Sequence, residues 1–492
     1  MGRDVPAIVI SHADRRAYRA KVRTCLDALT QVLRDSRFET EAQQIGLEIE
    51  LNLVDKCGAA SMQNADVLSR IGDPGWATEL ARFNLEVNIP PRLLAGAALG
   101  ELEAEVRACL RHADSRSQDA GCRLAMIGIL PTLAETDLHH SAMSPVPRFR
   151  LLNEQIFAAR GEEMSIAIDG AERLDTFVGT IMAEAACTSV QLHLQVSPDE
   201  FGSYWNAAQA VAGIQVALGA NSPFLFGREL WAETRITLFE QATDTRPDEL
   251  KIQGVRPRVW FGERWITSVF DLFEENLRYF PALLPLCDDE DPAEVLRAGG
   301  TPQLAELTLH NGTVYRWNRP VYAAVDGQPH LRVENRVLPA GPTVADTLAN
   351  AAFYYGLVRA LAEAERPVWS RMSFAAAQDN LLAGAKHGID ARLFWPGLGD
   401  VPVTELTLRH LLPLARQGLS QWGADTAATD RLLGIIEQRC LTGRNGATWQ
   451  VSSVHGLEAS GRCDRTEALR QMTMCYLEHM WSNQPVHTWP PM

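Results

Sequence analysis

The chain has 492 residues, 46% hydrophobic and 22% charged, a composition that supports one large core or two moderate ones and excludes disordered and collagen-like classes. Its net charge of −15 argues against non-specific nucleic-acid binding, which requires a basic surface. The nine cysteines are scattered and form no CxxC pair, so neither a zinc site nor a disulfide framework is indicated.

The first residues, MGRDVPAIVISHADRR, contain no apolar stretch of signal-peptide length. No later run approaches the apolar length that crosses a bilayer. Scattered cysteines without a disulfide pattern are typical of a reducing compartment. We therefore expect a soluble, cytoplasmic protein. The sequence leaves the oligomeric state open, a homodimer included.

The first of four alternating stretches, residues 45–53 (IGLEIELNL), has the period of a half-buried β-strand. Glu48 and Glu50 then project from one face about 6–7 Å apart, and Asn52 extends this polar row. Neighbouring carboxylates repel each other unless a positive charge lies between them. A hard cation such as Mg²⁺ meets that need, and the alternative interpretation is a polar sheet face in water.

Three later stretches also alternate, and each presents one polar face. Their polar residues are Glu86 and Asn88 within 83–89, Gln191 and His193 within 187–196, and Arg332, Glu334 and Arg336 within 330–338. Taken singly, each row also fits a simpler structural role, such as a satisfied buried histidine or a surface row of ion pairs.

Apolar residues spaced three or four apart predict helices elsewhere. These helices are expected over 14–36, 97–119, 150–160, 203–219, 344–365, 373–388, 404–421, 426–440 and 464–481. A short buried strand is expected over 124–130. Two strands are expected within 304–324 around the hairpin signal Asn311-Gly312, and Asp326-Gly327 marks a second turn.

Strands gathered before a run of helices predict an α+β fold with a mostly antiparallel sheet. We expect residues 1–343 to form the catalytic α+β domain. Residues 344–492 are expected to form a helical C-terminal region that packs on this domain and does not fold independently.

If the four polar rows lie in one curved sheet, they share a concave surface rich in carboxylates and arginines. Such a surface suits Mg²⁺ that bridges the phosphates of ATP, with arginines stabilising the charge that develops during phosphoryl transfer. The sequence contains no Gly-rich P-loop and no kinase signature. A nucleotide site would therefore have to lie on the sheet surface.

The chain resembles the glutamate–cysteine ligase (GCS2-type) family of the glutamine synthetase-like carboxylate–amine ligases. The resemblance covers roughly residues 45–395 and rests on several short motifs in the expected order. These motifs are Gly46-Leu-Glu-Ile-Glu50, Phe83-Asn-Leu-Glu-Val-Asn-Ile-Pro90, Cys187-Thr-Ser-Val-Gln-Leu-His-Leu194, Ala220-Asn-Ser-Pro-Phe224, Arg235, Leu331-Arg-Val-Glu-Asn-Arg336, and Asn380 with Ala385-Lys-His-Gly-Ile-Asp390.

The resemblance implies a glutamine synthetase-like sheet, curved and flanked by helices, and a two-step reaction. ATP phosphorylates an amino-acid carboxylate, that of glutamate in the named family, and an amine such as cysteine displaces phosphate to form an amide. Metal coordination by Glu48, Glu50, Glu86, Gln191 and Glu334 is implied. Catalytic contacts with ATP and the transferring phosphoryl group are implied for His193, Arg332 and Arg336, and a looser nucleotide contact for Arg319. Substrate binding is implied for Arg235, Asn88 and Arg148.

Two departures weaken the assignment of the acceptor. Plant-type relatives have Asn at the position of His193 and Asp at that of Gln195, and no residue here can be assigned to recognition of cysteine. The alternatives are therefore a carboxylate–amine ligase with another acceptor amine and a nucleotide-binding regulatory protein without turnover. Small molecules are the expected partners, with no nucleic acid and no membrane.

Overall fold

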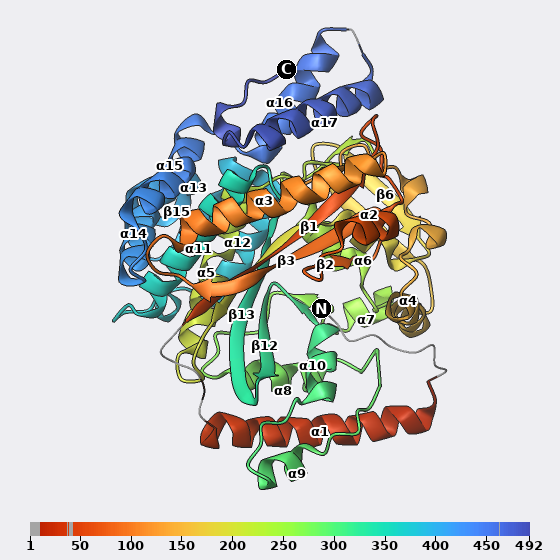
Figure 1. Cartoon of the computed structure of the whole chain (residues 1–492), viewed down its shortest axis with the longest axis vertical. Helices are drawn as coiled ribbons and strands as arrows, with labels where there is room; N and C mark the ends of the chain where they lie inside the picture. Colours follow the sequence, from red (N-terminus) through yellow and green to blue (C-terminus); the bar gives the residue numbers. More distant parts are fainter. Residues whose placement is uncertain (1–9, 37, 39–42, 462) are drawn as a thin grey trace.

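An antiparallel sheet of seven strands forms the centre of the protein (Figure 1). The computed structural model describes residues 10–36, 38, 43–461 and 463–492, so the first nine residues of the amino-terminal segment considered above lie outside it. The strand order is β12 (Asn318–Val325), β13 (Gln328–Pro339), β7 (Ser189–Gln195), β1 (Gln44–Val54), β3 (Asn84–Leu93) and β2 (Trp76–Thr78), with β4 (Arg123–Ala125) paired to β1.

The alternating sequence of β1 gives this strand two different faces. Leu47, Ile49 and Leu51 are at most 2% exposed and belong to the apolar core. Helices α5 (Phe201–Gly219) and α11 (Val344–Ala362) pack against the neighbouring strands β13 and β7. Nearly every residue of both helices is buried, as expected for helices that are apolar all round. The sheet therefore has rigid support behind its polar face.

The remaining elements surround this core. The helices are α1 (His12–Asp35), α2 (Asn64–Ile71), α3 (Ala98–Asp119), α4 (Pro147–Arg160), α6 (Thr234–Ala242), α7 (Asp248–Ile252), α8 (Val269–Tyr279), α9 (Pro292–Arg297), α10 (Ala305–Gly312), α12 (Phe374–His387), α13 (Val403–Leu406), α14 (Leu412–Gln421), α15 (Thr426–Thr442), α16 (Gly446–Ala459) and α17 (Arg465–Ser482). The small sheets are β5 (Met164–Asp169) with β6 (Arg173–Val178), β8 (Phe224–Leu225) with β9 (Arg228–Glu229), β10 (Val259–Trp260) with β11 (Tyr315–Arg316), and β14 (Arg392–Trp395) with β15 (Gly399–Pro402).

Glycines allow α5 and α12 to cross at unusually short range. A Cβ atom on Gly213 would lie 2.4 Å from the carbonyl carbon of Asn380, and one on Gly384 would lie 2.3 Å from the carbonyl oxygen of Gly213. The Asn380 side chain donates to the Phe394 carbonyl oxygen at 2.9 Å and accepts from its backbone N–H at 2.8 Å. The late sequence motif at Asn380 thus joins α12 to the strand that follows it.

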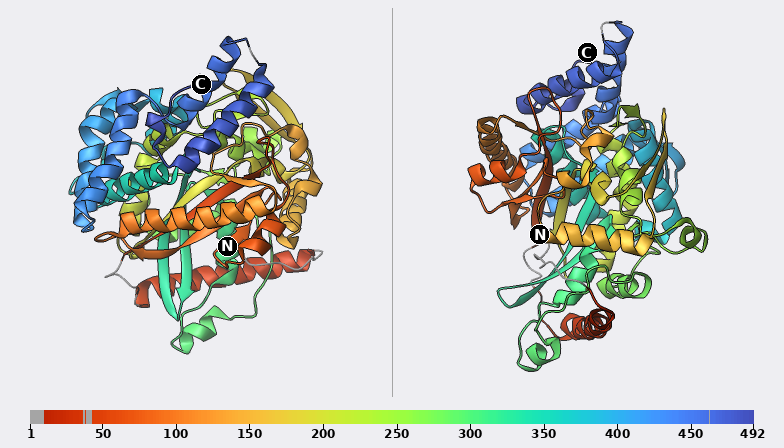
Figure 2. Two further views of the ribbon diagram at one scale, coloured as in Figure 1. Left: turned by 45° about the horizontal axis from the view of Figure 1, so that its top comes forward. Right: turned by 90° about the vertical axis from the view of Figure 1, so that its right-hand side faces the viewer.

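Helix α1 lies at the opposite end of the molecule from the carboxyl-terminal helices, as both views of Figure 2 show (red and blue). Three of its side chains converge on Glu306 of α10, whose carboxylate lies 3.2 Å from Lys21 Nζ. The same carboxylate accepts from Cys25 Sγ at 3.4 Å, and Tyr18 Oη donates to the Glu306 carbonyl oxygen at 2.7 Å. A single buried residue of α10 therefore receives three side chains of α1.

The expected α+β class and mostly antiparallel sheet are confirmed. Buried residues of 344–492 and of the sheet region belong to one continuous apolar cluster. The domain boundary at residue 343 stays a prediction. No helix in the described part of the chain combines the length and apolarity needed to cross a membrane.

The expected strand pair around Asn311-Gly312 is wrong, because residues 305–312 form helix α10. Asn311 Nδ2 donates to the Pro320 carbonyl oxygen at 2.7 Å, so this asparagine joins the helix end to β12 and does not sit in a hairpin turn. The hairpin forms later, at the expected turn Asp326-Gly327, where β12 and β13 pair.

The strand expected over 124–130 is also wrong beyond Ala125, where β4 ends. Helix α16 and the hairpins β5–β6 and β14–β15 were not predicted. The α16 sequence contains Gly, Ser and β-branched residues, which are weak helix formers. Tertiary packing holds this helix, since a Cβ on Gly446 would lie 2.1 Å from Asn221 Oδ1.

Replacing Gly213 with alanine should destabilise the protein by about 1–3 kcal/mol, because the new methyl group overlaps the α12 backbone. Urea unfolding of the purified variant measures this loss. The matched control is Gly434→Ala in α15, where a Cβ meets nothing within 4 Å and should stabilise the helix by about 0.5–1 kcal/mol. Equal stability of the two variants would contradict the close helix crossing.

Candidate active site on the polar face of the sheet

A cavity of about 1260 Å³ opens over the polar face of the sheet. Strands β1, β3, β7 and β13 supply one side, while α1, α4, α6 and α10 supply residues of the other sides. The lining includes every predicted site residue except Asn88 and His193. The four polar rows therefore do share one surface, as the sequence predicted.

Strand register brings the polar side chains of different rows opposite each other. Glu50 pairs with Glu86 across β1 and β3, and Glu48 pairs with Gln191 across β1 and β7. Glu334 faces His193 across β13 and β7. Because directly opposed side chains on one face lie about 4.5–5.5 Å apart at Cβ, these residues form one connected polar surface.

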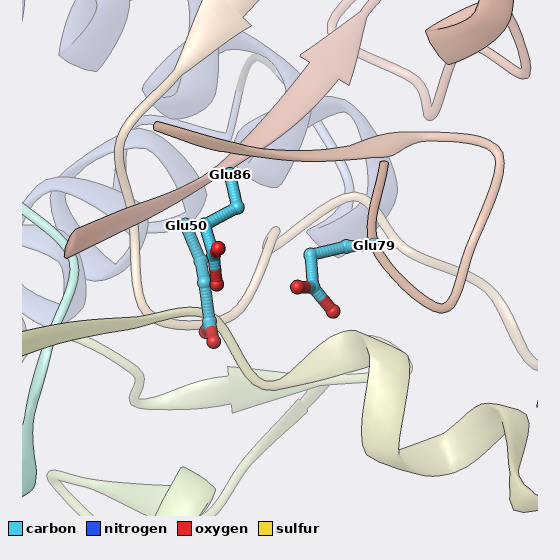
Figure 3. Close-up of side chains that lie close together, drawn as sticks. All are labelled: Glu50, Glu79 and Glu86. Atoms are coloured by element: carbon cyan, nitrogen blue, oxygen red, sulfur yellow. The ribbon is translucent and has the colours of Figure 1, made fainter. Parts of the chain in front are cut away.

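Three carboxylates meet at one end of this surface, from Glu50, Glu79 and Glu86 (Figure 3). Each offers an oxygen, and these oxygens all lie within 4.8 Å of one another. The Glu50 carboxylate is fixed in place, because it accepts from Ser189 N at 2.7 Å and from Gln191 Nε2 at 2.9 Å. We refer to Glu50, Glu79 and Glu86 as the carboxylate triad.

Burial raises the pKa of every carboxyl group in the triad, and neighbouring carboxylates add to this effect for Glu79 and Glu86. Burial raises the pKa of Glu50 above its ordinary value against the opposing charge of Arg336. Burial, followed by the charges of Glu86 and Glu50, raises the pKa of Glu79 well above its ordinary value. Burial, with Glu48 and Glu50 nearby, raises the pKa of Glu86 to about 7. Oxygen donors that repel one another fit a hard divalent cation, which would remove this repulsion.

Glu48, His193 and Arg332 form a second group beside the triad. Arg332 Nε donates to His193 Nδ1 at 3.0 Å, and the other ring nitrogen of His193, Nε2, lies on the side of Glu48. That nitrogen lies 3.1 Å from Glu48 Oε1. Burial raises the pKa of Glu48, but the hydrogen bond and charge of His193 outweigh it and the net pKa is lowered. The Glu48 carboxylate is therefore held ionised.

Glu334 lies between two arginines in a third group. Arg336 Nη1 lies 2.6 Å from Glu334 Oε1, and Arg319 Nη2 lies 2.8 Å from the same oxygen. These guanidinium groups overcome the effect of burial and hold the pKa of Glu334 well below its ordinary value. Arg336 also donates to Gln191 Oε1. The group of one carboxylate and two guanidiniums carries one excess positive charge.

The predicted substrate-binding residues occupy different positions relative to the cavity. Arg235 lines it, yet its guanidinium already donates to Glu233 Oε1 at 3.0 Å and to the backbone carbonyls of Arg336 and Val337. Arg148 on α4 also lines it and lies over the Phe149 ring, 5.0 Å from the centroid. Asn88 donates to Glu86 Oε1 at 2.8 Å and so acts on the cavity only through that carboxylate.

Sequence reasoning missed Glu79, Glu184 and the aromatic residues of the cavity wall. Glu79 lies in the loop after β2, where the sequence has no alternating pattern. Its contact with Glu86 therefore could not be predicted from their spacing in the sequence. Glu184 lies in the 3-10 helix η3 (Ile181–Ala186), outside any alternating strand. The only signal in the sequence is their position, since each lies a few residues before one of the alternating stretches.

A curved antiparallel sheet that carries clustered carboxylates beside arginines is the arrangement of a glutamine synthetase-like carboxylate–amine ligase. A profile of glutamate-cysteine ligase family 2 (GCS2) matches residues 44–466. The chain therefore belongs to glutamate-cysteine ligase family 2 and is a ligase.

A solved structure agrees with this fold. The crystal structure of glutamate–cysteine ligase from Francisella tularensis in complex with AMP matches with a TM-score of 0.53 and 12% identity, covering 91% of this chain and 90% of that one. A bifunctional glutathione synthetase from Pasteurella multocida matches less closely, with a TM-score of 0.48 and 14% identity, over 94% of this chain and 55% of that one. No curated protein is similar enough in sequence to count as a match.

The raised pKa of Glu86 predicts a pH-dependent instability of the metal-free protein. Its ordinary value is 4.5 and its folded value about 7, so the penalty is absent below pH 4.5 and complete above pH 7. In EDTA, the thermal midpoint of Glu86→Gln should therefore exceed that of the unmodified chain at pH 8 but not at pH 4.5.

The matched control is Glu48→Gln, for which the sign reverses. Because the folded pKa of Glu48 is lowered, its ionised form stabilises the fold above its ordinary pKa, and removing it should lower the midpoint at pH 8. Two glutamine variants that shift the midpoint in the same direction at pH 8 would refute the assigned charge environment.

Proposed function

We propose that this protein is an ATP- and Mg²⁺-dependent ligase that joins an amino-acid carboxylate, with glutamate the favoured acid, to an amine such as cysteine. The bond formed is an amide of the γ-glutamyl type, and the intermediate is an acyl phosphate. The observation that carries the proposal is one cavity wall on which a crowded carboxylate triad lies beside the arginine group around Glu334. Membership of the family supports the acid and the amine.

The donor set suits metal ions that carry phosphate. Glu50 and Glu86, joined by the unpredicted Glu79, would hold one Mg²⁺, while Glu48, Gln191 and Glu334 would supply further oxygen ligands. Bound Mg²⁺ would neutralise phosphate charge and orient the nucleotide. The oxygens of Glu334 would then bind both a metal ion and the arginines. The lowered pKa of Glu334 supports this role, because it keeps the carboxylate ionised.

The positive side chains would stabilise the transferring phosphoryl group. Arg332 and Arg336 lie on the same strand face, and Arg319 reaches it from β12. Planar guanidinium groups bind phosphate oxygens two at a time and stabilise charge without moving. His193 would contact phosphate through the ring that Arg332 already orients. The AMP bound in the Francisella enzyme is consistent with a nucleotide site in this fold.

Arg148 and Arg235 would bind the amino-acid substrate. Among the described residues, no carboxylate forms an ion pair with Arg148, so its guanidinium can receive a substrate carboxylate. Arg235 would have to exchange a backbone carbonyl for the substrate, and Asn88 would act by orienting Glu86. Small molecules are thus the proposed partners, and the cytoplasm is the proposed location.

The reaction is tested by incubating purified protein with ATP, Mg²⁺, glutamate and a panel of amines, cysteine first, and measuring phosphate release and the amide product. Release should require all four components. Turnover with a different amine would replace cysteine as acceptor. No release with any amine, from protein shown to be folded, would refute the proposal.

Replacing Glu50 with glutamine should lower turnover by about 10²–10³-fold, since it removes one charge that would hold the metal. The thermal midpoint must be measured alongside turnover, because the new NH2 group faces either the Ser189 N–H or the Gln191 amide and loses one of the hydrogen bonds that Glu50 accepts. The matched control is Glu163→Gln on the exposed turn before β5, which should keep full activity. Retained turnover in Glu50→Gln would remove this residue from the metal site.

A further inference from the structure

Glu184 is a carboxylate of the cavity that neither the triad nor the arginine groups use. It lies in η3, whose other residues, from Ile181 to Ala186, are all buried apolar side chains. The segment is anchored at its start, where the backbone N–H of Ile181 donates to Asn153 Oδ1 at 3.0 Å. Two residues of this segment line the cavity, Glu184 and Ala185, and Glu184 is the charged one. The buried apolar residues of η3 thus hold one charged side chain, that of Glu184, at the cavity.

The carboxylate of Glu184 lacks the hydrogen-bond donors that its neighbours have. Its Oε2 atom is buried, and no donor among the described residues reaches it. Glu50, by contrast, accepts from Ser189 and Gln191, and Glu334 accepts from two arginines. A buried charged oxygen without a donor is costly, and such groups persist where a ligand supplies the missing donor.

The charges around Glu184 favour a cation as that ligand. Burial raises the pKa of Glu184 to about 7, Arg336 opposes this effect and Glu50 adds to it. The guanidinium of Arg336 is already committed to Glu334 and Gln191. Glu184 is not a member of the carboxylate triad, whose oxygens converge elsewhere. An incoming ammonium group would supply both the positive charge and the N–H donors.

An aromatic wall lies on the same cavity. Phe239, Tyr315 and Trp317 all line it, with ring centroids of Phe239 5.4 Å from Tyr315 and 5.7 Å from Trp317. Helix α6, which carries Phe239, packs against η3. The charge of Glu184 also acts on Tyr315, so the carboxylate and the rings are close. Aromatic faces attract ammonium groups and accommodate an apolar body.

We propose that Glu184 receives the ammonium group of the acceptor amine, against the wall of Phe239, Tyr315 and Trp317, and takes the proton that this amine must lose. This inference rests on the function proposed above. The ammonium gives one proton to the carboxylate, and the freed nitrogen lone pair attacks the acyl carbon. The new C–N bond forms as the C–O bond to phosphate breaks. Phosphate leaves with that electron pair and takes the second proton that the nitrogen loses as the neutral amide forms.

Two small nucleophiles of similar size test this role, because they differ in charge at neutral pH. Hydroxylamine is uncharged and attacks an acyl phosphate without help, whereas methylamine is a cation that must lose a proton. Purified protein with ATP, Mg²⁺ and glutamate is supplied with hydroxylamine, methylamine or L-cysteine, and hydroxamate or amide is measured. Glu184→Gln should lower amide formation by about 10²–10⁴-fold, the usual contribution of a general base, and raise the KM for the amine. Hydroxamate formation should fall far less.

Three comparisons keep the inference distinct from the proposed function. Glu184→Asp, which keeps the charge, should restore part of the amide formation. Glu163→Gln removes an exposed carboxyl just before β5 that does not line the cavity, and it should change the two products equally or not at all. Absence of hydroxamate from the unmodified protein would refute the proposed function itself.

The inference on Glu184 fails under three other results. Equal loss of hydroxamate and amide in Glu184→Gln would place the residue in phosphoryl transfer or metal binding. Unchanged amide formation would give it no role with the amine. Hydroxamate without any amide from methylamine or L-cysteine, in the unmodified protein, would show that no ammonium site operates in this cavity.

Discussion

Electrostatic repulsion between carboxylates on neighbouring strands is the constraint on which the site depends. The sheet register places Glu50 opposite Glu86 and brings Glu48 and Glu334 close enough to interact. The protein relieves this repulsion unevenly. His193 and two arginines hold Glu48 and Glu334 ionised, whereas the triad has too few positive partners and retains raised pKa values. The part of the surface with the strongest unrelieved negative charge is therefore where a cation would bind most favourably.

This uneven arrangement needs a support that does not yield. Helices α5 and α11 are buried on all sides, and α12 approaches α5 so closely that only glycine fits at the crossing. A close-packed interior transmits little movement to the strands above it. Without a metal, the raised pKa values mean that the triad holds protons more readily than free carboxyl groups do, which lowers the repulsion. A bound cation would take the place of those protons.

Strand periodicity predicted the larger part of both fold and site. Period-two alternation identifies which side chains share a face, and this is why Glu48, Glu50, Glu86, Gln191 and Glu334 could be grouped from the amino-acid sequence alone. Contacts made by loops and short helices carry no such period, so Glu79 and Glu184 could not be found in this way. The hairpin signal Asn311-Gly312 failed for a related reason, because the same dipeptide also ends a helix whose asparagine bonds to a distant strand. Local patterns thus predict faces, but not the distant partners that complete a site.

Helix α1 forms part of the cavity wall although it lies outside the region that the family profile matches. The family match starts at residue 44, yet Asp14 and Ala17 of α1 line the cavity. The helix is fastened through Glu306, which would lose the partner charge of Lys21 if α1 were removed. A protein trimmed to the family boundaries would therefore lack one side of this cavity and expose a carboxylate that is now enclosed. The amino-terminal helix is a wall of the cavity, and the minimal complete unit extends beyond the region that the family profile matches.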